Sequence, residues 1–356
     1  MNLNKLIKSK NIEINALEKK KLFNLYIKKL TNHHIKKCVE YKSILKKLNY
    51  KISSIKNYED YPMLPVTIFK KLNLLSVNKS KIVKTLHSSG TSGQKTSKIY
   101  LDKQNSNDQM KVLTKIVNNV IGNDRLPMLI IDKNPKFATD ESFNARKVAI
   151  LGFSLFGKDY CYALNKDGEL NIKILNKFLK KNKNKKFLVF GFTYLIYKNL
   201  ILNLNKKKLI NNFSNGILIH GGGWKKMKDL SVSNNLFKSL LKKKISLKNI
   251  YNYYGLIEQT GSIFFECKNC GYLQTSIFSD VIIRDKEFNI LNNNQKGLIQ
   301  LVSLLPTSYP GHNILTEDIG EIVSSKNIKC NHKGKSFIVH GRSEESEVRG
   351  CSDVEQ

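Results

Sequence analysis

The sequence predicts an α/β protein with a smaller β-rich subdomain toward its C-terminus. The apolar runs LPMLIID, KKFLVFGF and NGILIHGGG each end in polar or glycine-containing turns, as buried and largely parallel strands do. Helical stretches such as SNDQMKVLTKIVNNVI and LSVSNNLFKSLLKKK are interspersed with these runs. After about Cys267 the pattern changes to short strands, for example VIIRD, KGLIQLVSLL and KSFIVHG. Loops at the carboxyl ends of the parallel strands are therefore the expected place for a ligand.

The N-terminal part of the chain is expected to be helical. Residues 1–60 contain segments such as LEKKKLFNLYIKKL, in which apolar positions recur every three to four residues, and YPMLPVTIFKKLNLL follows with two prolines before a short helix. We divide the chain into a helical segment that packs on the core (1–75), an α/β core (76–266), a β-rich subdomain (267–341) and a C-terminal tail (342–356).

Composition limits the class of protein. The 356 residues are 41% hydrophobic, which suffices for a full core, and no apolar run approaches the roughly 20 residues of a membrane helix. The start, MNLNKLIKSKNIEINALEKK, lacks the apolar centre of a signal peptide, so we expect a cytoplasmic protein without a membrane span.

The net charge of +33 permits two interpretations. It arises from 61 Lys and Arg against 28 Asp and Glu, and it is compatible with binding to nucleic acid. The lysines are, however, scattered along the whole chain beside many Asn and Ile residues, as in LKKNKNKK. This pattern favours solvated surface lysines over a nucleic-acid site.

A loop rich in Gly, Ser and Thr, SSGTSGQKTSK, extends from Ser88 to Lys98. Its glycines let backbone N–H groups approach an anion, its hydroxyls can donate to phosphate oxygens and its lysines add positive charge. The loop departs from the G-x-x-x-x-G-K-[ST] pattern of ATPases. The residues alone predict either a different phosphate-binding loop or a mobile polar turn.

Four further loops carry candidate ligand groups: HGGGWKK (220–226), NYYGLIEQTGS (252–262), TEDIGE (316–321) and HGRSEESEVRG (340–350). Glycines permit close backbone approach, a tyrosine can stack on a base, Glu258 can hold Mg²⁺ and Asp318 suits ribose hydroxyls. Each loop also has an ordinary structural explanation, such as a tight turn, packing or a solvated charge. Their order along the chain is more specific than any one of them.

That order resembles the adenylate-forming superfamily of acyl-CoA synthetases, and within it the LuxE-type acyl-protein synthetases. The phrases that carry the resemblance are FGFTYLIY, HGGGWK, VIIRD, LPTSYPGHNILTEDIG and EVRGCSD, and it extends from about LPVTIFKKLNLL to the C-terminus. The resemblance implies the large-domain fold of that superfamily, with mixed β-sheets flanked by helices, without the small C-terminal domain. It also implies that residues 76–266 bind nucleotide and acyl group.

The resemblance implies specific roles for residues at matching positions. Phosphate contacts fall on Ser89, Thr91, Ser92, Gly93 and Lys98. The adenine or acyl adenylate would lie beside Gly221, Gly222 and Gly223, with Tyr253 or Tyr254, next to Gly255, against the ring. Glu258 would hold Mg²⁺, while Asp318 and Arg342 would bind the ribose. Ile257 departs from the family pattern, which often has threonine there, and this puts one phosphate contact in doubt.

The implied reaction is ATP-dependent adenylation of a carboxylic acid, fatty or otherwise acyl, followed by transfer to a protein thiol. Positioning and charge neutralisation drive such phosphoryl chemistry, so glycine amides, lysine and Mg²⁺ suffice. Cys351 matches the family's acceptor cysteine in RGCSD, and the final partner is expected to be an acyl-carrier or reductase protein. Arg349 would lower the pKa of this thiol and the surrounding acidic residues would raise it, so the net sign stays open.

The cysteine pattern predicts a second, structural metal. Cys267 and Cys270 form C-x-x-C, and Cys330 lies two residues before His332. Three thiolates and one imidazole suit tetrahedral zinc, and Cys3His is a common ligand set. The alternative is two unrelated reduced pairs.

Three other functions stay open at this point. A phenylacetate-type acyl-CoA ligase would use CoA as the acceptor, and the missing C-terminal domain argues against it. A zinc-stabilised nucleic-acid-binding protein would explain the charge and the C-x-x-C, but not HGGGWK or YGLIEQTG. The third is a non-catalytic relative that acts as a binding module, and Ile257 is the one residue that supports it.

Overall fold

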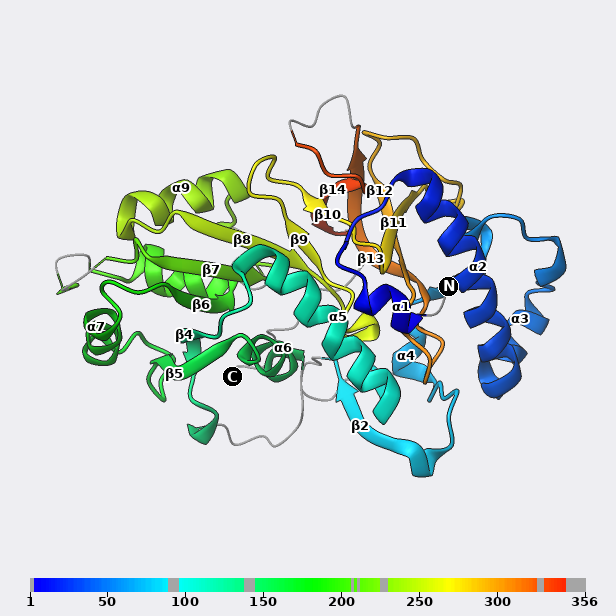
Figure 1. Cartoon of the computed structure of the whole chain (residues 1–356), viewed down its shortest axis with the longest axis horizontal. Coiled ribbons are helices and arrows are strands. Elements are labelled where there is room, and N and C mark those ends of the chain that lie inside the picture. Colours follow the sequence, from blue (N-terminus) through cyan, green and yellow to red (C-terminus); the bar gives the residue numbers. More distant parts are fainter. Residues whose placement is uncertain are drawn as a thin grey trace. The chain divides into compact units, whose positions relative to one another are not determined.

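The computed structural model describes residues 3–88, 96–137, 145–205, 208–209, 212–224, 230–324 and 330–343 (Figure 1). These residues group into two units. The first unit lies within Met1–Val117 and Tyr254–Arg349, and the second lies within Asn118–Tyr253. The first unit thus combines the predicted N-terminal helical segment and the predicted β-rich segment, which are far apart in the sequence.

The first unit contains an N-terminal group of helices and a mainly antiparallel sheet. Its elements are α1 (Leu3–Lys8), α2 (Ala16–Lys37), α3 (Val39–Lys47), η1 (Ile52–Ser54), η2 (Tyr58–Asp60), β1 (Leu64–Pro65), α4 (Ile68–Lys71), η3 (Lys79–Lys81), β2 (Ile82–His87), β3 (Lys98–Asp102), most of α5 (Lys103–Ile121), η8 (Ile257–Gln259), β9 (Phe264–Glu266), β10 (Leu273–Gln274), β11 (Ser279–Arg284), β12 (Gly297–Ser303), β13 (Asn313–Val323) and β14 (Ser336–Arg342).

The sheet of this unit has the order β11-β12-β13-β14-β10-β9, and β1 pairs in parallel with β13. The pairs β11–β12, β12–β13, β13–β14 and β10–β14 are antiparallel, as expected for strands joined by short turns. Apolar side chains from these strands, among them Phe264, Val281, Ile299 and Phe337, form a fully buried cluster. This confirms the short strands predicted after Cys267.

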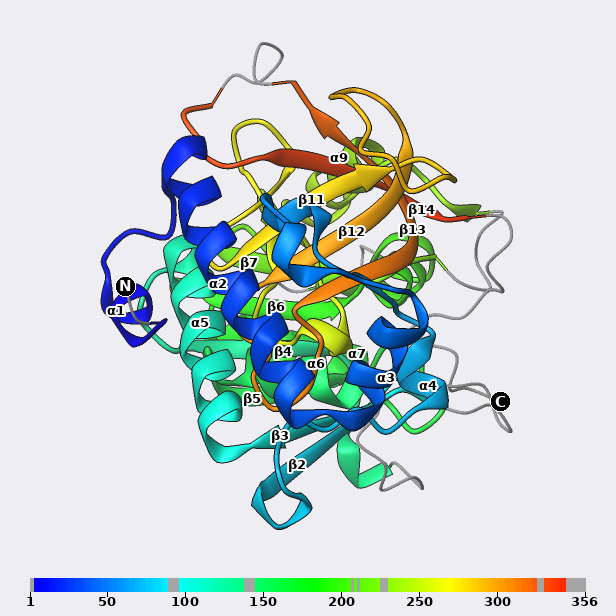
Figure 2. The ribbon, with the colours of Figure 1, turned by 90° about the vertical axis from the view of Figure 1, so that its right-hand side faces the viewer.

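Helix α2 (blue in Figure 2) is attached to β11 by a buried ionic contact. Asn15 caps its N-terminus, because the side-chain oxygen accepts a hydrogen bond from Glu18 N at 2.9 Å. Lys19 Nζ lies 3.1 Å from Asp280 Oδ1 with both side chains buried, and Lys335 Nζ lies 2.8 Å from Asp280 Oδ2. Tyr58 also donates a hydrogen bond to Asp280. The helix is therefore held at its first turn by a carboxylate with three partners.

We expect Asp280→Asn to lower the free energy of unfolding by about 3–5 kcal/mol, measured by urea denaturation. The amide would leave the buried ammonium of Lys19 without its counter-charge. A matched control is Asp159→Asn, because Asp159 pairs with Lys181 at 3.4 Å with both side chains exposed. Asparagine tolerates the φ of 49° at this position, and the control should cost less than about 1 kcal/mol. Equal losses in the two variants would contradict the prediction.

The same contact predicts a pH dependence. Burial alone would raise the pKa of Asp280, but the charges of Lys19 and Lys335 and the donated hydrogen bonds hold it below its ordinary value. The stabilisation is therefore present above the unfolded pKa of about 3.9 and is lost as the pH falls toward the folded value. Asp280→Asn should lose less stability than the natural chain between about pH 5 and 3.

The second unit is a parallel α/β sheet. Its elements are β4 (Leu126–Lys133), η4 (Pro135–Phe137), α6 (Ala145–Ser154), β5 (Gly157–Leu164), α7 (Ile172–Lys181), β6 (Phe187–Phe192), α8 (Thr193–Ile196), the π-helix η5 (Tyr197–Leu202), β7 (Gly216–Gly221), α9 (Asn234–Ile245) and β8 (Asn249–Tyr254). The strand order is β8-β7-β6-β4-β5, and each neighbouring pair is parallel (Figure 1).

Helices cover both faces of this parallel sheet. On one face, α7 and α9 bury apolar side chains such as Phe178 and Phe237 in a cluster with Leu129, Val189 and Leu218 of the strands. On the other face, Phe153 of α6 stacks on Phe190 of β6 with ring centroids 4.6 Å apart. A strand covered on both faces reads as a continuous apolar run, which explains why LPMLIID and KKFLVFGF were recognisable in the sequence.

Among the residues that the structure describes, no helix combines the length and the apolar character that crossing a bilayer requires.

Candidate active site

The glycine- and serine-rich loop is carried by a β-hairpin of the first unit. Strands β2 and β3 pair antiparallel, and their last register pair joins His87 to Lys98. Beyond it, Ser88 N donates to Ser97 O at 3.0 Å, and Ser97 N donates to Ser88 Oγ at 2.8 Å. The predicted phosphate contacts Ser89, Thr91, Ser92 and Gly93 lie outside the described residues. The described part shows that the loop starts and ends at a fixed base, with Lys98 exposed beside it.

Glu258 lies buried in the short helix η8, with 4% of its surface exposed. Its main-chain carbonyl accepts a hydrogen bond from Tyr309 Oη at 2.8 Å, which fixes the backbone at this position. Burial raises the pKa of the Glu258 carboxyl, while the nearby Ser97 hydroxyl and the charges of Lys70 and Arg342 lower it. The Glu258 carboxyl is therefore influenced by Ser97, at the base of the glycine- and serine-rich loop, and by Arg342.

Asp318 and Arg342 face each other across the β13–β14 pair, where they are register partners. Arg342 Nε lies 3.9 Å from Asp318 Oδ1, and Tyr254 Oη donates to Asp318 Oδ2 at 2.6 Å. Burial raises the pKa of Asp318, and the Tyr254 hydroxyl and the Arg342 charge oppose this shift. The structure thus brings together three residues that the sequence predicted as nucleotide contacts, and all three belong to the first unit.

The three glycines at 221–223 follow β7 in the second unit. A Cβ on Gly221 would come within 2.6 Å of the Tyr253 ring, and Gly222 has a φ of 80° with Phe192 2.9 Å from its Cβ position. At Gly223 nothing lies within 4 Å of such a Cβ. The first two glycines are thus required by packing and conformation, and the third leaves open space beside the backbone.

Thr193 connects the phrases FGFTYLIY and HGGGWK within the second unit. Its Oγ1 donates to Gly221 O at 3.2 Å and lies 3.0 Å from His220 Nδ1. Burial lowers the pKa of His220 to about 3, so the imidazole is neutral at physiological pH. This hydroxyl therefore fixes the start of the glycine loop.

The neighbouring tyrosines have different surroundings. The Tyr253 ring packs in the second unit, with its centroid 4.8 Å from that of Phe153, whereas Tyr254 contacts Asp318 in the first. A Cβ on Gly255 would lie 2.9 Å from Ile263 Cγ2, so this glycine allows a close turn after Tyr254. The chain therefore passes from one unit to the other within the motif YYGLIE.

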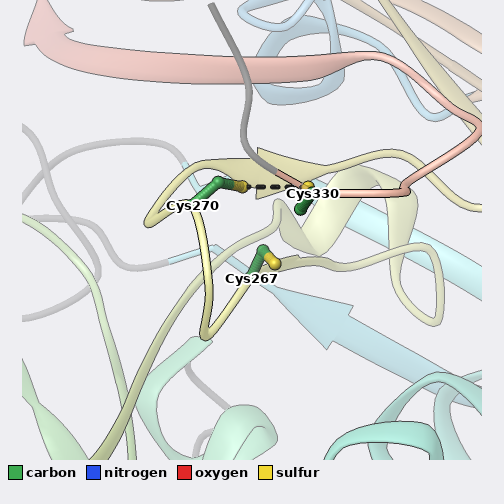
Figure 3. Close-up of side chains that lie close together, drawn as sticks. All are labelled: Cys267, Cys270 and Cys330. Atoms are coloured by element: carbon green, nitrogen blue, oxygen red, sulfur yellow. Dashed lines mark hydrogen bonds between the residues drawn. The ribbon is translucent and has the colours of Figure 1, made fainter.

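Three of the four predicted zinc ligands lie together. The sulfur atoms of Cys267, Cys270 and Cys330 are all within 4.8 Å of one another, and Cys270 Sγ is 3.4 Å from Cys330 Sγ (Figure 3). His332 is not part of this group, and its Nδ1 lies 2.8 Å from Glu13 Oε1. Cys351, the predicted acyl acceptor, lies outside the described residues.

Comparison with known proteins adds the observation that decides the family. The family model of "Acyl-protein synthetase, LuxE" matches residues 2–356. The chain belongs to this family. LuxE proteins are acyl-protein synthetases, and this chain is accordingly an ATP-dependent acid–thiol ligase that adenylates a carboxylic acid and transfers the acyl group to a protein thiol.

Relatives agree with this assignment in sequence and fold. The long-chain-fatty-acid–luciferin-component ligase of Vibrio harveyi is 22% identical over 341 residues, covering 94% of this chain and 87% of that protein. An open conformation of 2-hydroxyisobutyryl-CoA ligase, in complex with 2-HIB-AMP and CoA, superimposes with a TM-score of 0.70 at 12% identity. It covers 95% of this chain and 74% of the other, which confirms the large-domain fold of adenylate-forming ligases.

Several residues that contact the candidate site residues were not predicted from the sequence. Tyr309 holds the main chain of Glu258, the Ser97 hydroxyl lowers the pKa of the Glu258 carboxyl, and Thr316 Oγ1 accepts a hydrogen bond from Asp318 N at 3.1 Å. Tyr309 and Thr316 lie within LPTSYPGHNILTEDIG, so the resemblance marked the segment but gave these residues no role. A contact between residues far apart in the sequence leaves no recognisable pattern in the sequence around either residue.

Proposed function

We propose that this LuxE-family protein activates a long-chain fatty acid with ATP and Mg²⁺, holds the acyl group on Cys351 and passes it to a reductase or acyl-carrier protein. The observation that carries the proposal is the buried Glu258 carboxyl beside Ser97, at the base of the glycine- and serine-rich loop. The fatty acid is inferred from the Vibrio harveyi relative, whose name describes a ligase for long-chain fatty acids.

In the first step a carboxylate oxygen of the acid attacks the α-phosphorus of ATP, and the bond to the pyrophosphate leaving group breaks. The products are acyl-AMP and pyrophosphate. Glu258 would hold Mg²⁺, which supplies positive charge to the phosphates when bound, since carboxylate oxygens are ligands that this ion prefers. Lys98 and the loop at 88–98 would neutralise the remaining phosphate charge.

Asp318 and Arg342 would bind the ribose hydroxyls. The Asp318 carboxylate already accepts a hydrogen bond from Tyr254 and still has lone pairs for a hydroxyl donor. Gly221, Gly222 and Gly223 keep their predicted role beside the adenine or the acyl adenylate, and the open space at Gly223 supports a close backbone approach.

In the second step the Cys351 thiolate attacks the carbonyl carbon of acyl-AMP, the bond to the phosphate oxygen breaks and AMP departs. The product is a thioester on Cys351. A thiol of the partner protein can then attack this thioester, take over the acyl group and release the Cys351 thiol. The zinc ion expected from the cysteine motif would be a separate structural cofactor, and neither step passes through it.

Exchange of radioactive pyrophosphate into ATP, measured across a panel of carboxylic acids, tests this function. We expect exchange that requires both Mg²⁺ and an acid, with the highest rate for long-chain fatty acids. Exchange that is confined to short or aromatic acids would reject the substrate class, and its absence with every acid would reject the proposed reaction.

Asp318→Asn should raise the KM for ATP in the exchange assay by about 10- to 100-fold, because hydrogen bonds to a charged group contribute about 1.5–3 kcal/mol. Glu321→Gln is the matched control, since Glu321 lies on the same strand and pairs with His340 at 3.4 Å. The control should change the KM less than about twofold. A similar rise in both variants would mean that Asp318 acts only through strand β13.

A further inference from the structure

Strand pairing in the first unit assembles the three cysteines from two separate segments. Cys267 and Cys270 lie in the turn between β9 and β10, and Cys330 precedes β14, which pairs with β10 at Leu273 and Phe337. Gly271, with a φ of 76°, lets the turn close through a hydrogen bond from its N to Cys267 O at 2.9 Å. The sulfur positions therefore follow from the sheet and its turn.

The spacing of the sulfurs suits a tetrahedral ion. Zn–S bonds of about 2.3 Å at tetrahedral angles place two sulfurs about 3.8 Å apart. Cys270 Sγ and Cys330 Sγ are 3.4 Å apart, and the whole group lies within 4.8 Å (Figure 3). The three thiolates need only small movements to hold one zinc ion.

Hydrogen-bond donors point at all three sulfurs. Asn269 N donates to Cys267 Sγ at 3.4 Å, and Gln274 Nε2 lies 3.7 Å from Cys270 Sγ and 3.4 Å from Cys330 Sγ. Donors of this kind stabilise the negative charge that thiolate ligands carry. Neutral thiols that are merely packed together do not require such donors, so their presence favours thiolate ligands.

Nδ1 of His332 lies beside a carboxylate, and neither of its ring nitrogens makes a well-aligned hydrogen bond among the described residues. Its Nδ1 faces Glu13, whose Oε2 also accepts a hydrogen bond from Lys333 N at 3.2 Å. The His332 side chain is 5% exposed, and no hydrogen bond to its buried Nε2 occurs among the described residues. A metal-binding histidine commonly donates its other ring N–H to a carboxylate, which selects the nitrogen that binds the metal.

We propose that the thiolates of Cys267, Cys270 and Cys330 and Nε2 of His332 bind one structural zinc ion, and that Glu13 positions the histidine. The His332 ring has to move toward the sulfurs to complete the tetrahedron, because it lies outside their 4.8 Å group. Gly334 permits the close approach of the ring, since a Cβ there would lie 2.7 Å from Nε2. The ion would link the segment before α2 to the β9–β10 turn and to the residues before β14.

The proposal is tested first on the natural full-length chain. After expression with added zinc and exhaustive dialysis, elemental analysis should give one zinc per chain. Replacement by cobalt(II) should give the intense visible absorption of a tetrahedral ion with thiolate ligands. A protein that contains no metal and has two free thiols fewer than its cysteines provide would contain a disulfide, which would overturn the proposal. An octahedral cobalt spectrum would overturn it as well.

Variants then test the individual ligands by competition with a chromophoric chelator. Cys330→Ser and His332→Ala should each lower zinc affinity by at least 100-fold, whereas Cys161→Ser, a cysteine of β5 in the second unit, should keep one zinc per chain. His332→Ala with unchanged affinity and an unchanged cobalt spectrum would exclude His332 as a ligand. Removing zinc from the natural chain should also lower its Tm, a readout that needs no variant.

The positioning role of Glu13 has its own test. Glu13→Ala should weaken zinc binding by about 10- to 100-fold and leave the tetrahedral cobalt spectrum in place. Glu13→Gln should restore most of the affinity, because its amide oxygen accepts the same Nδ1–H bond. Equal affinity in Glu13→Ala and the natural chain would overturn this role.

Discussion

Glu258→Gln is expected to lower the rate of acid-dependent ATP–pyrophosphate exchange by about 10²–10³-fold. The amide keeps the size of the side chain but removes the negative charge that we propose for Mg²⁺, and losing one such electrostatic contact to the reacting phosphates costs about this much in rate. The backbone should stay in place, because Tyr309 holds the main-chain carbonyl of Glu258 and not its carboxyl.

The stability of Glu258→Gln shows whether a lower exchange rate comes from the loss of a metal ligand or from a damaged fold. Burial is the largest influence on the Glu258 carboxyl and raises its pKa, so the ionised group costs folding energy above that pKa. Glu258→Gln should therefore unfold at the same or a higher denaturant concentration than the natural chain at pH 7. Reduced exchange together with reduced stability would favour a structural role, and full exchange would remove Glu258 from the metal site. Glu321→Gln again serves as the matched control.

Cys351→Ser is expected to abolish covalent labelling of the protein by radioactive fatty acid while ATP–pyrophosphate exchange continues. A serine hydroxyl is a far weaker nucleophile than a thiolate, so acyl-AMP should form and accumulate until water hydrolyses it. Labelling is measured on denatured protein, and the label on the natural chain should be released by neutral hydroxylamine, as a thioester is.

Cys161→Ser is the control for this experiment, because burial raises the pKa of the Cys161 thiol to about 11 and makes it a poor acceptor. It should label like the natural chain. Labelling that persists in Cys351→Ser would place the acyl group elsewhere. Loss of exchange as well as labelling would show that Cys351 is needed before acyl transfer.

Sequence reasoning succeeded where a local pattern has one physical cause. The parallel strands of the second unit are buried on both faces, so their apolar runs are unbroken and were predicted as strands. The pairing of Asp318 with Arg342 could be anticipated only as a shared role, because the register of β13 and β14 joins residues 24 apart in the sequence.

Contacts between distant segments could not be predicted. Glu13 approaches His332 across more than 300 residues, and Lys19 approaches Asp280 across more than 250. The periodicity of apolar positions in the segment 1–60 predicted helices but gave no information on which strands they contact. Likewise, YYGLIE was predicted as one loop, whereas the boundary between the two units divides its tyrosines.

The high positive charge proved a poor guide to function. A net charge of +33 suited a nucleic-acid-binding protein, yet the match to the LuxE family spans residues 2–356 and accounts for HGGGWK and YGLIEQTG. Lysines that are scattered along a whole chain reflect composition, whereas the ordered series of loops reflects chemistry.

Detection of the acyl adenylate is the most direct test of the central claim, that this chain joins a carboxylate to AMP. With ATP labelled at the α-phosphorus, Mg²⁺ and a long-chain fatty acid, the Cys351→Ser protein should accumulate radioactive acyl-AMP together with pyrophosphate. Formation of ADP and phosphate, or no acid-dependent adenylate from any acid tested, would contradict it.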